Sequence, residues 1–171
     1  MPKVAGTSPT GSPAGGPFAP IHKSVRVTAD VAHTFKVFTA MGDWWPADHS
    51  LLPQGSSAGR SVVIEPRAGG RWYERAKDGT ECAWGKVIEW SPPKRLILGW
   101  QINGQFQFDP SATTEVQIDF IAESPTTTRV DLEHRYFDRY PETGAALRTG
   151  VDSPDGWSLG LAAFAKVAGD R

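Results

Sequence analysis

The chain has little of several features that define common classes of protein. Its 171 residues include a single cysteine, Cys82, so no intramolecular disulfide can form, which fits a reducing compartment. No apolar run approaches the roughly 18 residues of a transmembrane helix, and the N-terminus lacks the apolar stretch of a signal peptide. The net charge of −1 lacks the basic excess typical of nucleic-acid-binding proteins. We therefore expect a cytoplasmic protein without a membrane span or a nucleic-acid partner.

Common catalytic and cofactor motifs are also missing. The sequence has no G-x-S-x-G elbow and no G-x-G-x-x-G phosphate loop. None of the four histidines, His22, His33, His49 and His134, has a recognised zinc spacing. We therefore expect no metal, no cofactor and no catalytic residue of these types. The sequence favours a protein that is not an enzyme, although it does not decide the question.

Residues 1–20 are rich in Pro, Gly, Ser and Thr, and Phe18 is their only aromatic residue. Such a segment buries too little apolar surface to offset its ordering entropy, which predicts a disordered tail. The remaining residues, 21–171, amount to about 150, the common size of one domain.

Strand signals dominate the domain. Asp78-Gly79 predicts a hairpin turn because both residues tolerate positive φ, and Pro92-Pro93 predicts another turn because proline cannot donate to a sheet. The last two predicted strands alternate between apolar and polar residues, which indicates a sheet covered on one face only. The predicted strands span residues 21–28, 62–65, 71–75, 81–90, 95–101, 115–123 and 127–137.

Helices are expected at both ends of this series. Asp30 is a candidate N-cap for a helix that ends at Gly42, and residues 43–46 form a turn or a second short helix. Residues 141–167 are predicted to be helical, with a break at Pro154. Their last part carries an apolar stripe formed by Trp157, Leu161, Phe164 and Ala168. The order predicts an α+β fold, in which a curved antiparallel sheet of about six to seven strands wraps around a long C-terminal helix.

Tryptophan is the most informative residue type. Four of the seven tryptophans, Trp72, Trp84, Trp90 and Trp100, lie between residues 69 and 100. Any one of them, like Trp157, is explained by ordinary core packing. As a set, so many large rings are hard to pack at normal density, which favours an apolar cavity. Indole N–H groups in its wall would orient polar atoms of a ligand.

Three polar positions have two readings each. His134 lies on the apolar face of its strand and is either a hydrogen-bonded core residue or a proton donor or acceptor in the cavity. Asp48 and His49 follow Trp44-Trp45 and either line the mouth of the cavity or belong to a solvated loop.

Glu74 shares a strand face with Trp72 if the strand alternates regularly. An inward carboxylate needs a partner because an unpaired buried charge is costly. Arg67, Arg71 and Arg75 are the candidate partners. A structural ion pair is the favoured role, and general acid or base the alternative.

An ordered set of short motifs carries a family resemblance: Trp44-Trp45-Pro46, Glu65-Pro66-Arg67, Gly69-Gly70-Arg71, Tyr73-Glu74-Arg75, Asp78-Gly79, Trp84-Gly85-Lys86-Val87, Pro92-Pro93-Lys94-Arg95-Leu96, Trp100, Leu132-Glu133-His134 and Gly156-Trp157. With this set the chain resembles the START-like (SRPBCC, Bet v 1-like) superfamily, and within it the C-terminal domain of the Hsp90 activator Aha1.

The resemblance implies a helix-grip fold, with two short helices after the first strand and a cavity for a small hydrophobic molecule between the sheet and the C-terminal helix. It leaves two alternatives open: an enzyme acting on a hydrophobic or polyketide-like substrate, and an Hsp90-associated protein of the stress response. The candidate cavity residues are Trp44, Trp45, Trp72, Glu74, Trp84, Trp100, Phe120, His134, Tyr136, Trp157, Leu161 and Phe164.

Overall fold

The computed structural model describes residues 16–53 and 55–170. Its main element is a curved, seven-stranded sheet in the order β1-β7-β6-β5-β4-β3-β2, with every neighbouring pair antiparallel. The strands are β1 (Ile21–Val27), β2 (Ser61–Ile64), β3 (Arg71–Arg75), β4 (Glu81–Ser91), β5 (Arg95–Trp100), β6 (Thr114–Ser124) and β7 (Thr127–Arg135).

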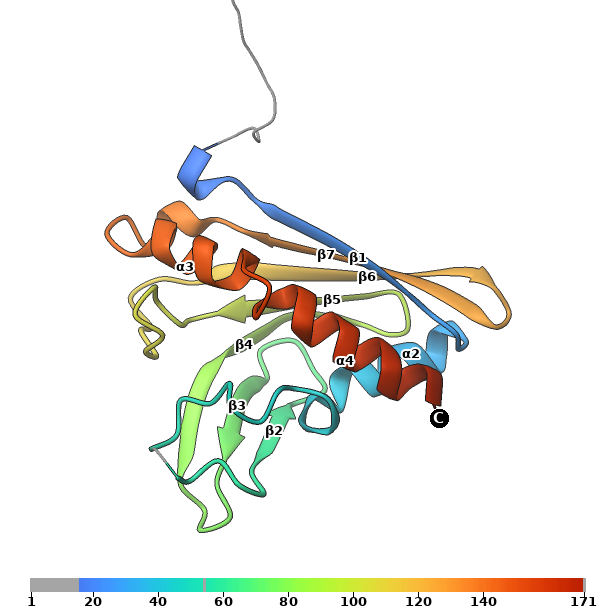
Figure 1. Ribbon diagram of the computed structural model, residues 1–171, viewed down its shortest axis with the longest axis horizontal. Coiled ribbons are helices and arrows are strands. Elements are labelled where there is room, and N and C mark those ends of the chain that lie inside the picture. The colour runs from blue at the N-terminus through green and yellow to red at the C-terminus, as the bar shows by residue number, and fades with distance from the viewer. Residues whose placement is uncertain (1–15, 54, 171) are drawn as a thin grey trace, which may run out of the picture.

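Three helices, α2 (Val31–Thr39), α3 (Gly144–Asp152) and α4 (Trp157–Asp170), lie on the concave side of this sheet (Figure 1). The sheet curls like a half-barrel, and α4 runs across it beside α2. This is the predicted helix-grip arrangement of the α+β class. No helix in the described part of the chain combines the length and the apolar character that crossing a membrane would require.

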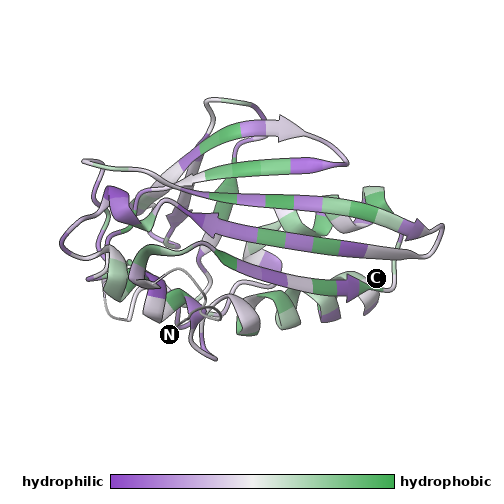
Figure 2. Ribbon diagram, turned by 90° about the horizontal axis from the view of Figure 1, so that it is seen from above, coloured by the Kyte–Doolittle hydropathy of each residue, from purple (hydrophilic) through white to green (hydrophobic). Residues whose placement is uncertain are grey.

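Residue alternation explains why the sheet is covered on one side. Along β6 and β7 the side chains alternate between buried and partly exposed, and Figure 2 shows the matching bands of apolar and polar residues. Val130, Leu132 and His134 point inward as predicted. Tyr136 does not continue the pattern, because the strand ends at Arg135 and Tyr136 takes a left-handed conformation with φ of 72°. Its ring is therefore exposed.

The first helix begins as predicted and ends earlier. The Asp30 carboxylate accepts a hydrogen bond from the backbone N–H of His33 at 2.7 Å, which is an N-cap. The α-helix stops at Thr39, and the short 3-10 helix η2 (Met41–Asp43) follows and contains Gly42. Gly42 therefore does not end the helix.

The C-terminal region is helical with a break at the predicted place. Helices α3 and α4 are separated by residues 153–156, which include Pro154. Leu161 and Phe164 of α4 are buried over the sheet as the apolar stripe predicts.

Part of the predicted tail belongs to the described structure. Gly16–Phe18 forms a 3-10 turn, η1, and Phe18 packs against the hydrophobic core. The Arg148 guanidinium donates to the carbonyl of Ala19 at 2.6 Å. The prediction for residues 1–15 lies outside the described residues.

Candidate functional site

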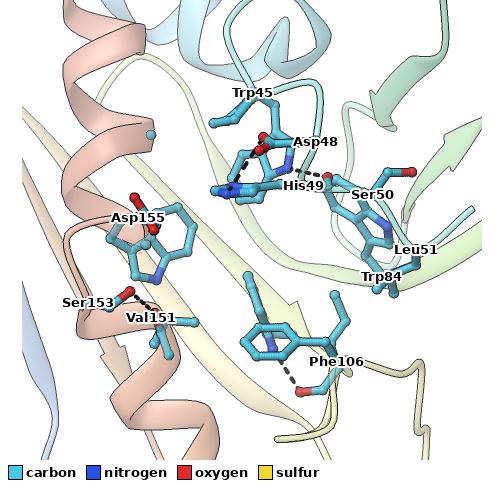
Figure 3. A pocket seen from close by; sticks show the side chains of 17 residues that line it. Trp45, Asp48, His49, Ser50, Leu51, Trp84, Phe106, Val151, Ser153 and Asp155 are labelled. Carbon is cyan, nitrogen blue, oxygen red and sulfur yellow. Dashed lines mark hydrogen bonds and ion pairs between the residues drawn. The ribbon is translucent and has the colours of Figure 1, made fainter. Parts of the chain in front are cut away.

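An open pocket of about 440 Å³ lies between the sheet and the junction of α3 and α4 (Figure 3). Trp84 and Trp100 line it from the sheet, and Trp157 lines it from the first turn of α4. Trp45 closes the wall from the segment after η2. We call this site the indole pocket after these four residues.

The wall is part of a closed ring of five indoles. Trp45 contacts Trp84 and Trp157, with ring centroids 5.3 and 5.7 Å apart. Trp72 joins Trp84 to Trp100 at 5.5 and 5.8 Å, and Trp100 contacts Trp157 at 5.8 Å. These separations suit tilted and edge-to-face aromatic contacts. Trp72 does not line the pocket and is fully buried behind the wall.

All four wall indoles use their N–H groups inside the protein. The acceptors are the carbonyl of His49 for Trp45 (3.0 Å), a carboxylate oxygen of Glu74 for Trp84 (2.9 Å), the carbonyl of Ile102 for Trp100 (2.9 Å) and Nδ1 of His134 for Trp157 (3.1 Å). This differs from the expectation that the indole N–H groups orient a ligand. The wall instead presents aromatic carbon surface to the pocket.

Glu74 is fully buried and anchors one side of this wall. Its carboxylate accepts hydrogen bonds from the hydroxyl of Ser50 (2.6 Å), the backbone N–H of Leu51 (2.6 Å), Nε of Arg60 (3.0 Å) and the indole of Trp84. Four donors satisfy a buried carboxylate that would otherwise be costly. Glu74 therefore holds the segment that carries Ser50 and Leu51 against the sheet.

The partner of Glu74 is Arg60 and not one of the three predicted arginines. The Arg60 side chain is only 5% exposed and also donates to the carbonyls of Pro46 and His49. Arg71 and Arg75 instead pair with Glu81, and Arg67 pairs with Glu65. The predicted partners follow from closeness in sequence, whereas Arg60 reaches Glu74 from the loop before β2.

His134 is also fully buried and lies behind the wall. Nδ1 accepts from Trp157, and Nε2 lies 2.9 Å from the hydroxyl of Thr114. Desolvation by burial lowers the pKa of His134 to about 3. The ring is therefore neutral, Nε2 carries its proton, and Thr114 is free to donate to the carbonyl of Trp100 at 3.3 Å.

The other predicted cavity residues lie outside the pocket lining. Trp44, Phe120, Leu161 and Phe164 belong to a filled part of the core under α2 and α4. The ring of Trp44 packs on Phe164, and its N–H donates to the carbonyls of Val37 and Phe38. The exposed ring of Tyr136 lies under the guanidinium of Arg139, 4.1 Å from its centroid. The hollow thus lies at one end of α4 and does not extend along the whole helix.

Asp48 and His49 line the mouth of the pocket, which was one of their two readings. Figure 3 shows them across the mouth from Asp155 and Ser153. Six further lining residues were not predicted from the sequence: Ile102 and Phe106 after β5, Gly150 and Val151 at the end of α3, and Ser153 and Asp155 between α3 and α4. Of these six residues, only Phe106 could have been suspected from its residue type, because it is aromatic. Phe106 is 47% exposed in the structure.

The family model of the Activator of Hsp90 ATPase homolog 1-like proteins matches residues 28–169. The chain belongs to this family. No curated protein sequence matches it.

Three solved structures resemble this chain over nearly their whole length. The anthrahydroquino-gamma-pyrone synthase Txn09 is 37% identical, with a TM-score of 0.61, over 90% of this chain and 99% of the synthase. The self-sacrificing resistance protein CalC from Micromonospora echinospora is 32% identical, with a TM-score of 0.66, over 91% and 97% of the two chains. Protein NE0264 from Nitrosomonas europaea is 14% identical, with a TM-score of 0.59, over 93% and 99%, and shows the fold alone.

Membership of the Activator of Hsp90 ATPase homolog 1-like family agrees with the indole pocket of this chain, because both indicate a ligand-binding START-like domain. The family match covers α2, β2 to β7 and both parts of the C-terminal helical region. It therefore includes all four wall indoles and the groups that hold them.

Proposed function

We propose that the protein binds a flat, mostly apolar molecule of the aromatic polyketide type in the indole pocket. The observation that carries this proposal is the wall itself: four indoles face an open pocket and have no free N–H group. The volume of about 440 Å³ is within the roughly 300–1,000 Å³ usual for small-molecule sites.

Such a wall suits a fused aromatic ring system. Burial of apolar surface contributes about 25 cal/mol per Å², and each well-placed aromatic contact adds roughly 0.5–1.5 kcal/mol. Because each wall indole already donates its N–H to an acceptor within the protein, the wall offers no hydrogen bond to a polar ligand core. Polar groups of a ligand would have to point out of the mouth.

The name of one relative supports the chemical class, and the name of a second agrees with ligand binding. At 37% identity one relative is named a synthase of an anthrahydroquino-gamma-pyrone, which is a fused aromatic product. At 32% identity another is named a resistance protein. Ligand binding is the property that either role would require of this fold.

The direct test is a titration of protein carrying ¹⁵N-labelled tryptophan with 1,8-dihydroxyanthraquinone as the probe. We expect shifts of the indole signals of Trp45, Trp84, Trp100 and Trp157, and no comparable shift for Trp90. Gly160 lines the pocket, and a Cβ added there meets only Trp44, at 3.6 Å. Gly160→Leu should therefore fill the pocket and abolish the shifts.

A matched control is Gly169→Leu at the exposed end of the same helix, which should bind normally. Shifts that persist in Gly160→Leu, or a wild-type protein whose wall indoles ignore the probe, would contradict the proposal.

Ring closure is a second candidate function, and one observation favours it. His49 lines the pocket, so its imidazole, the side chain most often used as a general base, is at the pocket surface; its Nε2 lies 3.9 Å from the Asp48 carboxylate. In an ortho-hydroxyaryl 1,3-diketone, the phenol oxygen would attack the distal carbonyl, His49 would take the phenol proton, and loss of water would leave a gamma-pyrone. His134 and Glu74 have no support for this role, because both are buried behind the wall with their polar atoms engaged.

The test is mass spectrometry of an anthraquinone that carries such a diketone, incubated with the protein. Formation of the pyrone that slows at least tenfold in His49→Gln, with binding retained, would support catalysis. A rate equal to that without protein would leave ligand binding as the only supported function.

Contact with an Hsp90 chaperone stays a prediction from the family, and stimulation of a bacterial Hsp90 ATPase would test it.

A further inference from the structure

The charged groups that line the indole pocket all have one sign at neutral pH. Asp48 and Asp155 contribute carboxylates, and no lysine or arginine is present among the described lining residues. Both aspartates are exposed, Asp48 on the segment after η2 and Asp155 on the segment between α3 and α4 (Figure 3). The pocket therefore has an apolar interior and a mouth that carries negative charge.

The other polar groups of the lining are already engaged. The Ser50 hydroxyl donates to Glu74 at 2.6 Å, and the Ser153 hydroxyl donates to the carbonyl of Gly150 at 2.7 Å. The wall indoles have no free N–H. Apart from the His49 imidazole, the side-chain groups left to meet a ligand are the two carboxylates, which only accept hydrogen bonds when ionised.

Three cations of the described residues are already paired with carboxylates that do not line the pocket. Arg60 is almost fully buried, and its guanidinium is 3.0 Å from the Glu74 carboxylate. Lys23 and Arg148 both pair with Asp152, at 2.9 and 3.8 Å. Asp155, by contrast, forms no hydrogen bond or ion pair with the described residues. The Asp48 side chain is 88% exposed, and its carboxylate lies 3.9 Å from the His49 imidazole. These two carboxylates are available to a ligand.

We propose that the pocket selects ligands by the charge of the end that points out of the mouth. Resting on the proposed binding of a flat aromatic core, this inference names the rest of the ligand: it carries hydrogen-bond donors or a protonated amine there. A carboxylate at the same position meets two like charges and no donor. Open-chain polyketide acids and fatty acids are therefore disfavoured, and neutral or amine-bearing aromatic molecules are favoured.

The test compares three probes with one core: 2-(aminomethyl)anthraquinone, 2-(hydroxymethyl)anthraquinone and anthraquinone-2-carboxylate. Titration calorimetry at pH 8, where imidazole is ordinarily neutral, and at low ionic strength should rank them in that order. We expect the amine to bind about tenfold more tightly than the carboxylate, and we expect added salt to reduce this difference in affinity.

Variants assign the effect to the mouth. Asp155→Asn and Asp48→Asn should each reduce the ratio of amine affinity to carboxylate affinity about threefold, the size expected for exposed charge pairs. Asp170→Asn removes the same charge at the far end of α4 and should leave this ratio unchanged.

Two outcomes separate this inference from the proposed function. If all three probes shift the wall indoles but the carboxylate binds as well as the amine, charge selection is overturned and the pocket proposal stands. If none of the three binds, both proposals fall. If the affinity difference between the amine and the carboxylate is unchanged in both asparagine variants, the role of these carboxylates is also overturned.

Discussion

The indole of Trp157 donates a hydrogen bond to Nδ1 of His134 across 3.1 Å, and so ties the first turn of α4 to β7 behind the pocket. The bond requires an unprotonated Nδ1. The burial that lowers the pKa of His134 to about 3 keeps the ring in that form. The wall position of Trp157 therefore depends on a neutral histidine.

This dependence predicts acid sensitivity. Because the pKa of His134 is lower in the folded than in the unfolded chain, the unfolded state binds more protons between about pH 6.5 and pH 3. The contribution of His134 to the free energy of unfolding should be fully present above pH 6.5. It should fall as the pH drops through this window, by a few kcal/mol at most. Urea unfolding of wild type and His134→Gln at pH 7.5, 5.5 and 4.5 measures this loss. An equally steep loss in the variant would contradict the assignment to His134.

Two tryptophans offer a matched comparison of hydrogen bonding. The Trp84 N–H donates to the Glu74 carboxylate, whereas the Trp72 N–H is buried without a hydrogen-bond partner among the described residues. Replacement by Phe removes the same atoms from two adjacent, buried rings. We expect Trp84→Phe to be more destabilising than Trp72→Phe by roughly 1.5–3 kcal/mol, because only Trp84 donates to a charged group. Equal losses in chemical denaturation would contradict this.

The buried pair of Glu74 and Arg60 should show strong coupling. Arg60→Met leaves the Glu74 carboxylate without its cation and should cost roughly 3–5 kcal/mol. The double variant Arg60→Met, Glu74→Met removes both charges and should lose less than the sum of the single variants. A double-mutant cycle measured by urea unfolding tests this. Additive losses would mean that the pair does not act as a unit.

A contact at the mouth predicts a change in binding without loss of stability. A Cβ added to Gly150 would lie 2.8 Å from Cζ of Phe106, so Gly150→Ala must displace that exposed ring. Alanine also suits the α3 helix better, by up to about 1 kcal/mol. We expect unchanged or higher thermal stability and roughly two- to tenfold weaker binding of 1,8-dihydroxyanthraquinone, the range of one aromatic contact. Gly169→Ala is the control, and equal affinities would exclude Phe106 from the site.

Local rules were enough to predict most of the fold. The Asp30 cap, the turn at Asp78-Gly79 and the break at Pro154 each follow from the chemistry of one or two residues, and all three are in the structure. Alternation predicted the buried faces of β6 and β7 because a strand has a fixed period of two. It failed at Tyr136, where the chain leaves the strand with a positive φ.

The site was less accessible to prediction, because it depends on contacts between distant segments. Periodicity predicts that Glu74 shares a strand face with Trp72, but it contains no information on the loop that brings Arg60 to the Glu74 carboxylate. Similarly, the loops with Phe106 and Asp155 have no repeating pattern and meet only after the sheet curls. Composition predicted many indoles near a cavity, but not which of them reach it.

Each indole of the wall is at once part of the pocket surface and a link between strands, helices and loops. A mutation that reshapes the wall therefore also loosens the fold, whereas the loops around the opening tolerate exchange at little cost in stability. In related proteins with this architecture, we therefore expect ligand preference to change through the loops first, while the wall tryptophans are retained.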